Sequence, residues 1–399
     1  MNGVIQLEEI SMTMQTSRWV CLASALMFVL TASARAQTSE TVLHNFYWTQ
    51  GNTIFPDELF LGPDAIYGTT YQGGSDSVGG CGGGCGSAYK LGFDGQFAQL
   101  HAFSISDGMN PYGVVLGPSG NRYGTASRGG AYGGGVIYLL APSGTETIVH
   151  DFGAVGDGRN PTAPLLRSPA GDLYGTTELG GCCEDGGVIF RLTHTGVYTV
   201  LYHFTRGLDG GQPTAGVIAD PDGNLYGTAW NDGLYRYGVI YELSAAGYQV
   251  LYSFTGGADG GEPVFGVTRD GAGNLYGTND GNGATNQGVV YKLDPAGDFT
   301  VLHTFTGPDG AQPASGVILD AAGNLYGTTY QGGPGGGGVV YQIDAAGTFQ
   351  VLFAFTTAAG GLSPGPIVLN PAGDLIGTTQ LGGQYRKGTV YVLKNIGAR

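Results

Sequence analysis

Histidine recurs at one equivalent position along the chain, which raises the question of a shared metal site. The four copies are His44, His101, His150 and His303. Imidazole is a common metal ligand, so these side chains could bind one ion together. In other copies of the same position the residue is a large aromatic ring, at Tyr202, Tyr252 and Phe353. We therefore favour packing between neighbouring units over metal binding.

Aspartate followed by glycine recurs in a second position, a few residues after the first. The five copies are Asp107, Asp157, Asp209, Asp259 and Asp309. Carboxylates at equivalent loops could bind a cation or carry out acid–base catalysis. Aspartate before glycine also stabilises a turn by accepting hydrogen bonds from the nearby backbone. We favour this structural interpretation, and we expect neither a metal nor a cofactor.

A third position varies in size, charge and aromaticity, while the residues around it stay nearly constant. It follows each copy of the string "YGT" and opens the next loop. These loop-opening residues are Tyr71, Ser127, Glu178, Trp230, Asp280, Tyr330 and Gln380. Aromatic rings beside amides and carboxylates suit sugars or peptides, although exposed loops also vary where little constrains them. Six of these residues (all but Ser127) and two neighbours, Arg128 and Asp232, make up the candidate ligand-binding set: Tyr71, Arg128, Glu178, Trp230, Asp232, Asp280, Tyr330 and Gln380.

Four cysteines form two local pairs in equivalent loops. Cys81 and Cys85 stand in "GGCGGGCGS", and the adjacent residues Cys182 and Cys183 stand in "GGCCEDGG". We predict a disulfide between Cys81 and Cys85 and regard a Cys182–Cys183 bond as the less secure of the two, because its ring strains the peptide between them. A zinc site of four cysteines is the alternative.

The elements that position these residues come from a tandem repeat. The tyrosine of "YGT" occurs at Tyr67, Tyr123, Tyr174, Tyr226, Tyr276 and Tyr326, with Ile376 in the last copy. The intervals are 56, 51, 52, 50, 50 and 50 residues, which indicates a repeat architecture. One unit contains four short apolar runs separated by glycine, proline or aspartate, at residues 299–305, 316–320, 324–329 and 338–344. These runs predict four strands, and we expect "YGT" to pack one unit against the next.

The number and order of the runs predict a closed ring. Apolar runs that lack alternation need cover on both faces, which stacking of small antiparallel sheets provides. The run ending in phenylalanine occurs seven times, at Phe46, Phe103, Phe152, Phe204, Phe254, Phe305 and Phe355. The chain begins with this run, and the seventh unit lacks it. We therefore predict an all-β, seven-bladed β-propeller of four-stranded antiparallel blades, in which the N-terminal strand completes the last blade (3+1).

This order of strands also predicts where the candidate residues lie. The strand that carries the histidines should be outermost in each blade. The loop after "YGT" and the loop with the recurrent Asp-Gly should emerge on one face, near the mouth of the central channel.

The repeat pattern "GNLYGTT..GG....GVVYKLD..G..TVLHTF" resembles the tandem repeat of exported bacterial proteins known as GloVer-containing, or choice-of-anchor tandem repeat, proteins. The resemblance covers residues 41 to 395 and is most specific in repeats three to six. It implies an exported repeat protein. The family carries no established activity, so the resemblance transfers no site residue.

The N-terminal segment predicts export. The apolar stretch "WVCLASALMFVLTASARAQ" ends in small residues that signal peptidase prefers, so we predict a signal peptide at residues 1–36 and a propeller domain at residues 37–399. We expect a secreted or periplasmic monomer with no transmembrane segment in the mature chain. A net charge of −15 disfavours nucleic acid as a partner.

Known catalytic motifs are missing from the sequence: it contains no H-E-x-x-H, G-x-S-x-G, P-loop or EF-hand string. The hypothesis is therefore an exported, non-catalytic propeller that binds a glycan or a protein on the loop face near the central channel. The alternative is a propeller-type lyase or hydrolase that acts on extracellular or cell-wall polymers. Convergence of an acid and a base on one position would favour the alternative.

Overall fold

The computed structural model describes residues 38–50, 59–74, 81–183, 185–356, 361–394 and 396. Residues Thr38–Ile396 form one compact unit. The predicted signal peptide lies outside the described residues. Strands dominate the described residues, and the one helical element there is a single 3₁₀ turn at Pro118–Gly120.

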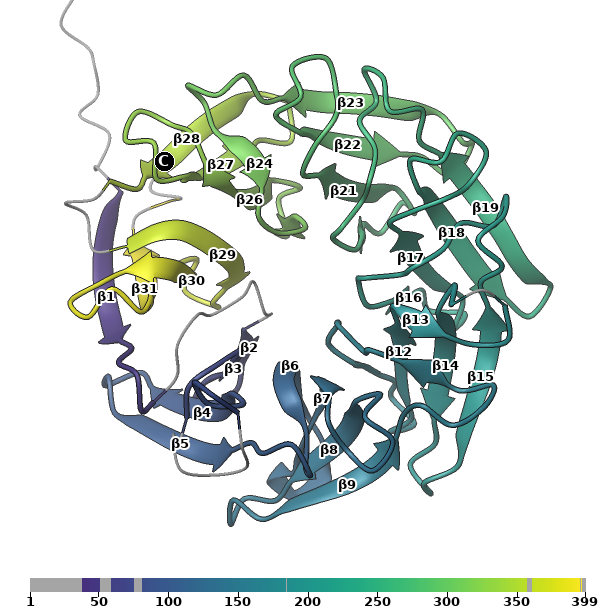
Figure 1. Ribbon diagram of the computed structural model, residues 1–399. Coiled ribbons are helices and arrows are strands. Elements are labelled where there is room, and N and C mark those ends of the chain that lie inside the picture. Colours follow the sequence, from purple (N-terminus) through teal and green to yellow (C-terminus); the bar gives the residue numbers. More distant parts are fainter. Residues whose placement is uncertain are drawn as a thin grey trace, which may run out of the picture. The chain divides into compact units, whose positions relative to one another are not determined.

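Seven four-stranded antiparallel sheets, here called blades 1 to 7, surround a central axis (Figure 1). Blades 1 and 2, given from the axis outward, contain β2 (Phe60–Leu61), β3 (Ala65–Thr70), β4 (Ser87–Gly92), β5 (Phe97–Ala102), then β6 (Met109–Leu116), β7 (Arg122–Arg128), β8 (Val136–Leu140) and β9 (Glu146–Asp151). Blades 3 and 4 contain β11 (Leu166–Arg167), β12 (Leu173–Thr177), β14 (Val188–Leu192), β15 (Tyr198–His203), then β16 (Ile218–Ala219), β17 (Leu225–Ala229), β18 (Val239–Ser244) and β19 (Gly247–Ser253).

The remaining blades follow the same plan. Blades 5 and 6 contain β20 (Thr268–Arg269), β21 (Leu275–Asn279), β22 (Val289–Leu293), β23 (Phe299–Thr304), then β25 (Ile318–Leu319), β26 (Leu325–Gln331), β27 (Val339–Ile343) and β28 (Phe349–Ala354). Blade 7 contains β29 (Gly361–Leu369), β30 (Leu375–Gly382), β31 (Thr389–Lys394) and β1 (Ser39–Asn45). Short additional strands extend two blades, as β10 (Gly158–Arg159) with β13 (Leu179–Gly180) in blade 3 and β24 (Ala311–Pro313) in blade 6.

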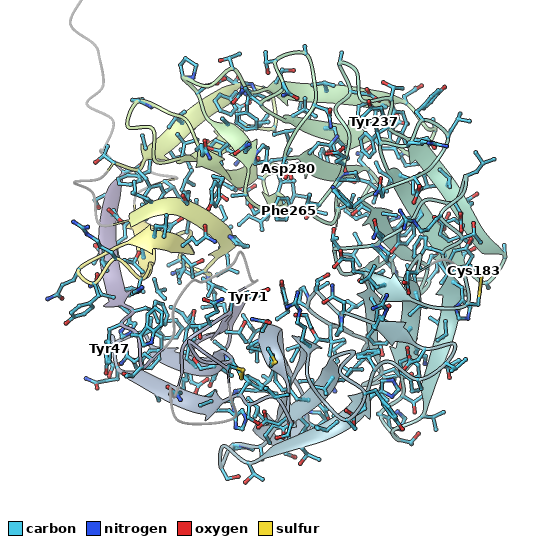
Figure 2. The ribbon with its side chains drawn as sticks, viewed as in Figure 1. Tyr47, Tyr71, Cys183, Tyr237, Phe265 and Asp280 are labelled. Atoms are coloured by element: carbon cyan, nitrogen blue, oxygen red, sulfur yellow. A yellow bond between two sulfur atoms is a disulfide. The ribbon has the colours of Figure 1, made fainter. Side chains whose placement is uncertain are left out.

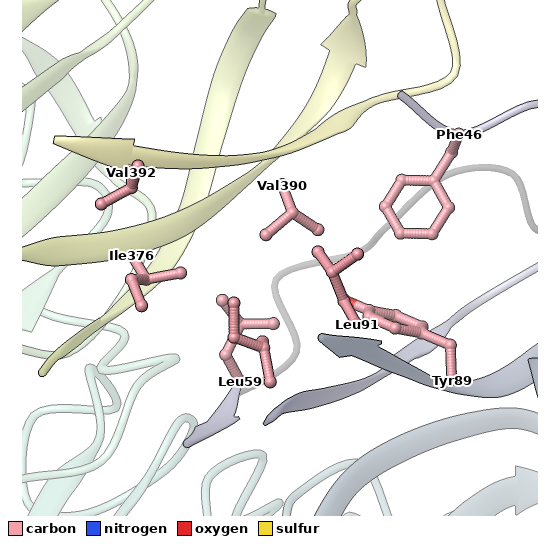
Figure 3. Close-up of a cluster of buried hydrophobic side chains, with 8 residues drawn as sticks. Phe46, Leu59, Tyr89, Leu91, Ile376, Val390 and Val392 are labelled. Carbon is pink, nitrogen blue, oxygen red and sulfur yellow. The ribbon is translucent and has the colours of Figure 1, made fainter. Parts of the chain in front are cut away.

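The N-terminal strand closes the ring, as the order of repeats predicted. β1 pairs antiparallel with β31 at the outer edge of blade 7, and Figure 1 shows it in purple beside the yellow C-terminal strands. Phe46, which follows β1, is fully buried between blades 7 and 1. Figure 3 shows it in a cluster with Tyr89 and Leu91 of blade 1 and with Val390 and Val392 of blade 7. The predicted 3+1 closure is confirmed.

The glycine of "YGT" lies opposite a buried ring in every blade. The cross-strand pairs are Gly68–Tyr89, Gly124–Tyr138, Gly175–Phe190, Gly227–Tyr241, Gly277–Tyr291, Gly327–Tyr341 and Gly377–Tyr391. A Cβ added to Gly277 would lie 2.3 Å from the Tyr291 hydroxyl. No larger residue fits there, because the ring of the next strand already fills the space.

The threonine and tyrosine of "YGT" join adjacent blades. The threonine hydroxyl donates a hydrogen bond to a main-chain carbonyl of the following blade, as from Thr228 to Phe265 (3.0 Å) and from Thr278 to Ser315 (2.8 Å). The ring of Tyr276 packs against the apolar cluster that blade 5 shares with blade 6. Its hydroxyl donates to Asp270 (3.0 Å), at the turn before the strand. The string therefore repeats for structural reasons, as expected.

Candidate functional site

The two loops that carry the candidate residues lie on the same face, as predicted. In blades 2 to 6, the segment after the Asp-Gly turn runs antiparallel to the segment that opens the loop after "YGT". Gly211 pairs with Asn231 in blade 4 and Gly261 with Gly281 in blade 5, while β10 pairs with β13 in blade 3. We call this face of the propeller the loop face. In Figure 2, Tyr71 and Asp280 lie beside its central opening.

The recurrent histidines and aspartates form one structural unit. His303 Nε2 lies 2.9 Å from Asp309 Oδ2, and the Tyr202 hydroxyl donates to Asp209 over the same distance. The other oxygen of Asp309 accepts the backbone N–H of Thr306 (2.8 Å), which fixes the turn. The His303 ring also stacks on Phe349 of the next blade, with ring centroids 3.6 Å apart. The predicted roles in packing and in turns are both confirmed, and the structure makes them partners.

The cysteines are bonded in two local pairs. Cys81 is joined to Cys85 and Cys182 to Cys183, each in a loop between the second and third strands of its blade. Over the described ranges, His, Cys, Asp and Glu side chains form no group of three that could hold a metal ion.

A ring of residues that sequence reasoning missed lies beside the loop-opening residues. Six polar residues that precede proline have left-handed backbone, with φ between 55° and 60°, and are Asn110, Asn160, Gln212, Glu262, Gln312 and Ser363. Each backbone N–H donates to a carbonyl of the preceding blade, over 2.7 to 2.9 Å. Left-handed backbone outside glycine is costly and persists where surrounding contacts enforce it. The recurrent polar-residue–proline pair was the signal in the sequence that could have revealed this ring.

These pre-proline residues contact several of the predicted site residues. Asn160 donates a side-chain hydrogen bond to Glu178 within blade 3, and Asn110 donates to the carbonyl of Tyr71 in the preceding blade (2.9 Å). Glu262 and Asp280 flank the bridge between Gly261 and Gly281 and are therefore cross-strand neighbours.

Other predicted residues make contacts across a blade boundary or within their own blade. The Tyr330 hydroxyl donates to the side-chain oxygen of Gln380, which links blades 6 and 7. Trp230 is half-buried, and its backbone N–H donates to Gln212 (3.2 Å). The Asp232 carboxylate forms an ion pair with Arg206 (3.2 Å), a residue in the Asp-Gly loop of the same blade.

Burial raises the pKa of two loop-opening carboxyl groups, those of Asp280 and Glu178. Desolvation and the charge of Glu262 raise the pKa of Asp280 to about 6. Desolvation also raises the pKa of Glu178, while the hydrogen bond from Asn160 and the charge of Arg128 oppose that shift.

Exposed apolar side chains gather on the loop face. The described residues contain fourteen large apolar side chains that are exposed. Nine of these lie in the loops of this face, at Tyr47, Trp48, Ile105, Tyr132, Val155, Leu208, Leu234, Tyr235 and Tyr385. Two lie in turns of the opposite face, at Phe93 and Val197. Among the described residues, the loop face therefore carries most of the exposed large apolar side chains.

No helix among the described residues is long and apolar enough to cross a membrane.

Among solved structures, the fold is similar to virginiamycin B lyase from Staphylococcus aureus, with a TM-score of 0.59, 12% identity, and coverage of 90% of this chain and 99% of the lyase. It is also similar to the extracellular domain of a one-component system from B. thetaiotaomicron, with a TM-score of 0.58, 9% identity, and coverage of 89% of this chain and 40% of that chain. At these identities the likeness shows the fold alone.

Sequence comparison identifies the family. No curated protein matches the sequence. A family model described as the Gloeobacter/Verrucomicrobia repeat matches residues 77–270 and 233–398, which together span most of the chain. The chain belongs to the Gloeobacter/Verrucomicrobia repeat family.

Proposed function

We propose that the protein is an exported, non-catalytic binding propeller whose ligand, a glycan or a protein, docks on the loop face beside the central channel. The observation that carries this proposal is the gathering of nine exposed apolar side chains in the loops of that face. Exposed apolar side chains of loops are groups that a bound ligand could cover and remove from water.

A glycan is the ligand that the surrounding chemistry favours. Half-buried aromatic rings at Tyr71, Trp230 and Tyr330 stand in one ring with the amides of Asn160 and Gln212. Aromatic faces pack on the apolar faces of sugars, and fixed amides can donate to and accept from hydroxyl groups. A protein ligand would be expected to use the outer aromatic side chains instead.

The test is a glycan array probed with the full chain, followed by titration of the best ligand. Trp230→Ala should weaken binding at least tenfold, because it removes a large, half-buried ring from the loop face. Phe93→Ala is the matched control, since this exposed ring lies on the opposite face. A glycan bound equally by both variants would contradict this location, and the absence of any glycan ligand would leave a protein as the ligand class.

Export and a monomeric state belong to the same proposal. Two disulfides are typical of an oxidising compartment, and they fit the predicted cleavage before Gln37. Mass spectrometry of secreted material should find Gln37 at the N-terminus, and light scattering should give the mass of one chain. An intact Met1 in the secreted material would contradict cleavage of a signal peptide, and a dimer would contradict the monomeric state.

A lyase or hydrolase is the second candidate, and Asp280 is the observation that favours it. Its pKa of about 6 lies close to neutral pH, and Glu262 is its cross-strand neighbour. Such a pair could exchange a proton with a bound polymer. Reducing-end assays with the bound glycan would detect cleavage, and Asp280→Asn should abolish it. Binding without turnover would exclude this candidate for that glycan.

A further inference from the structure

A pocket of about 240 Å³ opens between blades 2 and 3. Its walls come from the end of β7 and the loop after it in blade 2, and from the paired segments β10 and β13 in blade 3. The lining residues are Ser127, Arg128, Gly133, Gly134, Arg159, Asn160 and Leu179. Arg128 is one of the ligand-binding residues predicted from the sequence. Arg159, the other arginine that lines the pocket, was not predicted.

Two arginine side chains line the pocket, and one of them, Arg159, already forms an ion pair with Asp185. Arg128 is exposed, and within the described residues its side chain has no hydrogen bond or ion pair. Glu178 interacts with it through charge, but the carboxylate of Glu178 accepts its hydrogen bond from Asn160 instead. Arg159 donates from Nε and Nη2 to Asp185, over 3.2 and 2.5 Å, which leaves Nη1 available. A guanidinium that is free to bind in this way recognises planar anions such as carboxylates.

The backbone around the pocket is fixed from both blades. Asn160 has left-handed backbone (φ 60°), and its N–H donates to the carbonyl of Gly134 across the blade boundary (2.7 Å). The carbonyl of Asn160 in turn accepts the N–H of Glu178 (3.0 Å). Ser127 is buried, and its hydroxyl donates to the carbonyl of Asn110 (3.4 Å). Because these contacts exist without a ligand, binding requires little ordering of the site.

An exposed aromatic ring belongs to the same loop. Tyr132 lies between Arg128 and the pocket-lining residues Gly133 and Gly134 in the chain, and 67% of its side chain is exposed. Its Cβ contacts the position that a side chain at Gly153 would occupy, so the base of Tyr132 lies against the neighbouring Asp-Gly loop. A large exposed ring beside a cationic pocket offers one surface for a sugar ring and another for an acidic group.

We propose that this pocket recognises the carboxylate of a uronic acid residue in an acidic polysaccharide. The inference rests on the proposed glycan-binding function of the loop face and narrows its ligand class. Arg128 and the free Nη1 of Arg159 hold the carboxylate, and Tyr132 packs on the sugar. The protein as a whole carries a charge of −15, so it does not attract anions in general. A preference for acidic sugars would therefore come from the arginines of this pocket.

Isothermal titration of the full chain with hexagalacturonate and with its carboxyl-reduced, neutral counterpart tests the inference. The acidic oligosaccharide should bind at least tenfold more tightly, and added salt should reduce that preference. Arg128→Gln should remove most of the preference while leaving the melting temperature unchanged. Arg386→Gln is the matched control, because it removes the same charge from an exposed loop-face arginine in blade 7.

Each other outcome overturns a distinct claim. Equal affinity for the two oligosaccharides, unchanged in Arg128→Gln, would overturn the uronate pocket and leave the glycan-binding proposal standing. Binding of neither oligosaccharide, together with no ligand on the glycan array, would overturn both. A peptide whose binding needs its free C-terminal carboxylate and Arg128 would show that the pocket takes a protein ligand, which overturns the assignment to a polysaccharide.

Discussion

The two faces of the propeller repeat to different degrees. On the face opposite the loop face, the same contacts recur: Asp270 accepts hydrogen bonds from Asn274 and Tyr276, and Asp320 accepts them from Asn324 and Tyr326. On the loop face, the His/Tyr–Asp pairs also recur, but the residues that open the loop after "YGT" change partner from blade to blade. Tyr330 bonds Gln380, whereas Asp280 neighbours Glu262.

This difference separates scaffold from site within one repeat. Positions that make the same contact in successive blades hold the ring together, so their identity follows from packing. Positions that change partner from blade to blade lie where the scaffold does not require one residue type. The loop face is therefore free to carry specificity, and the following predictions test that division.

Removal of the closing strand should have the largest effect. Deletion of residues 37–48 removes β1 and Phe46, which leaves the edge of β31 unpaired and a buried cluster open between blades 7 and 1. We expect aggregation and loss of the cooperative melt, measured by light scattering and circular dichroism. A truncated chain that stays monomeric and equally stable would show that the ring does not depend on this strand.

Loss of a buried ring opposite the "YGT" glycine should come next. Tyr291→Ala should lower the free energy of unfolding by about 3–5 kcal/mol, because a fully buried ring leaves a cavity. Tyr291→Phe is the control. The Tyr291 hydroxyl is buried without a partner in the structure, and blade 3 already carries Phe190 at this position, so we expect the change to be neutral or slightly stabilising. Chemical denaturation measures both, and a large loss in Tyr291→Phe would reveal a hydroxyl partner.

The histidine–aspartate unit shows how much of the scaffold the sequence could predict. Period, strand runs and the seven phenylalanines were sufficient for the number of blades and for closure, because these depend on local patterns. His303 and Asp309 were assigned to packing and to a turn separately. Their pairing could not be inferred from either position alone, although a spacing of six or seven residues recurs between such partners.

The site was less accessible to sequence reasoning. The shared face of the two loops follows from strand order and was predicted correctly. The pocket formed by Arg128 and Arg159 was not, because the two residues are 31 positions apart and come from different blades. Their proximity depends on the inter-blade bond from Asn160 to Gly134. The polar-residue–proline pair is visible in the sequence, but it does not show which carbonyl of the neighbouring blade accepts this bond.

Titration of the outer rim should produce a smaller effect. Glu40 and Glu146 begin their outermost strands where five other blades carry an aromatic ring, and burial raises the pKa of each carboxyl to about 7. The folded state therefore binds more protons than the unfolded state between pH 4.5 and 7, so stability should fall as pH rises through this window. Melting temperatures across that range should show the decline, and Glu40→Gln should reduce its slope. Stability that rises over the same window in the wild type, with no difference in Glu40→Gln, would contradict this assignment.

The smallest effect on stability should come from the loop face itself. Trp230 is half-buried and belongs to no apolar core cluster in the described residues, so Trp230→Ala should cost less than about 1 kcal/mol. Denaturation curves alongside Phe93→Ala, from the opposite face, give the comparison. A loss as large as that of Tyr291→Ala would place Trp230 in the scaffold.

A paired melting and binding experiment on Tyr291→Ala and Trp230→Ala tests the division between scaffold and site most directly. Both variants are melted, and both are titrated at low temperature with the glycan that the array identifies. The account predicts that Tyr291→Ala lowers the melting temperature by many degrees while the folded fraction keeps its affinity. Trp230→Ala should melt within a few degrees of the wild type and bind at least tenfold more weakly. An unchanged melting temperature in Tyr291→Ala, together with a large fall in the melting temperature of Trp230→Ala, would contradict the account. Trp230 would then belong to the scaffold, and Tyr291 would not.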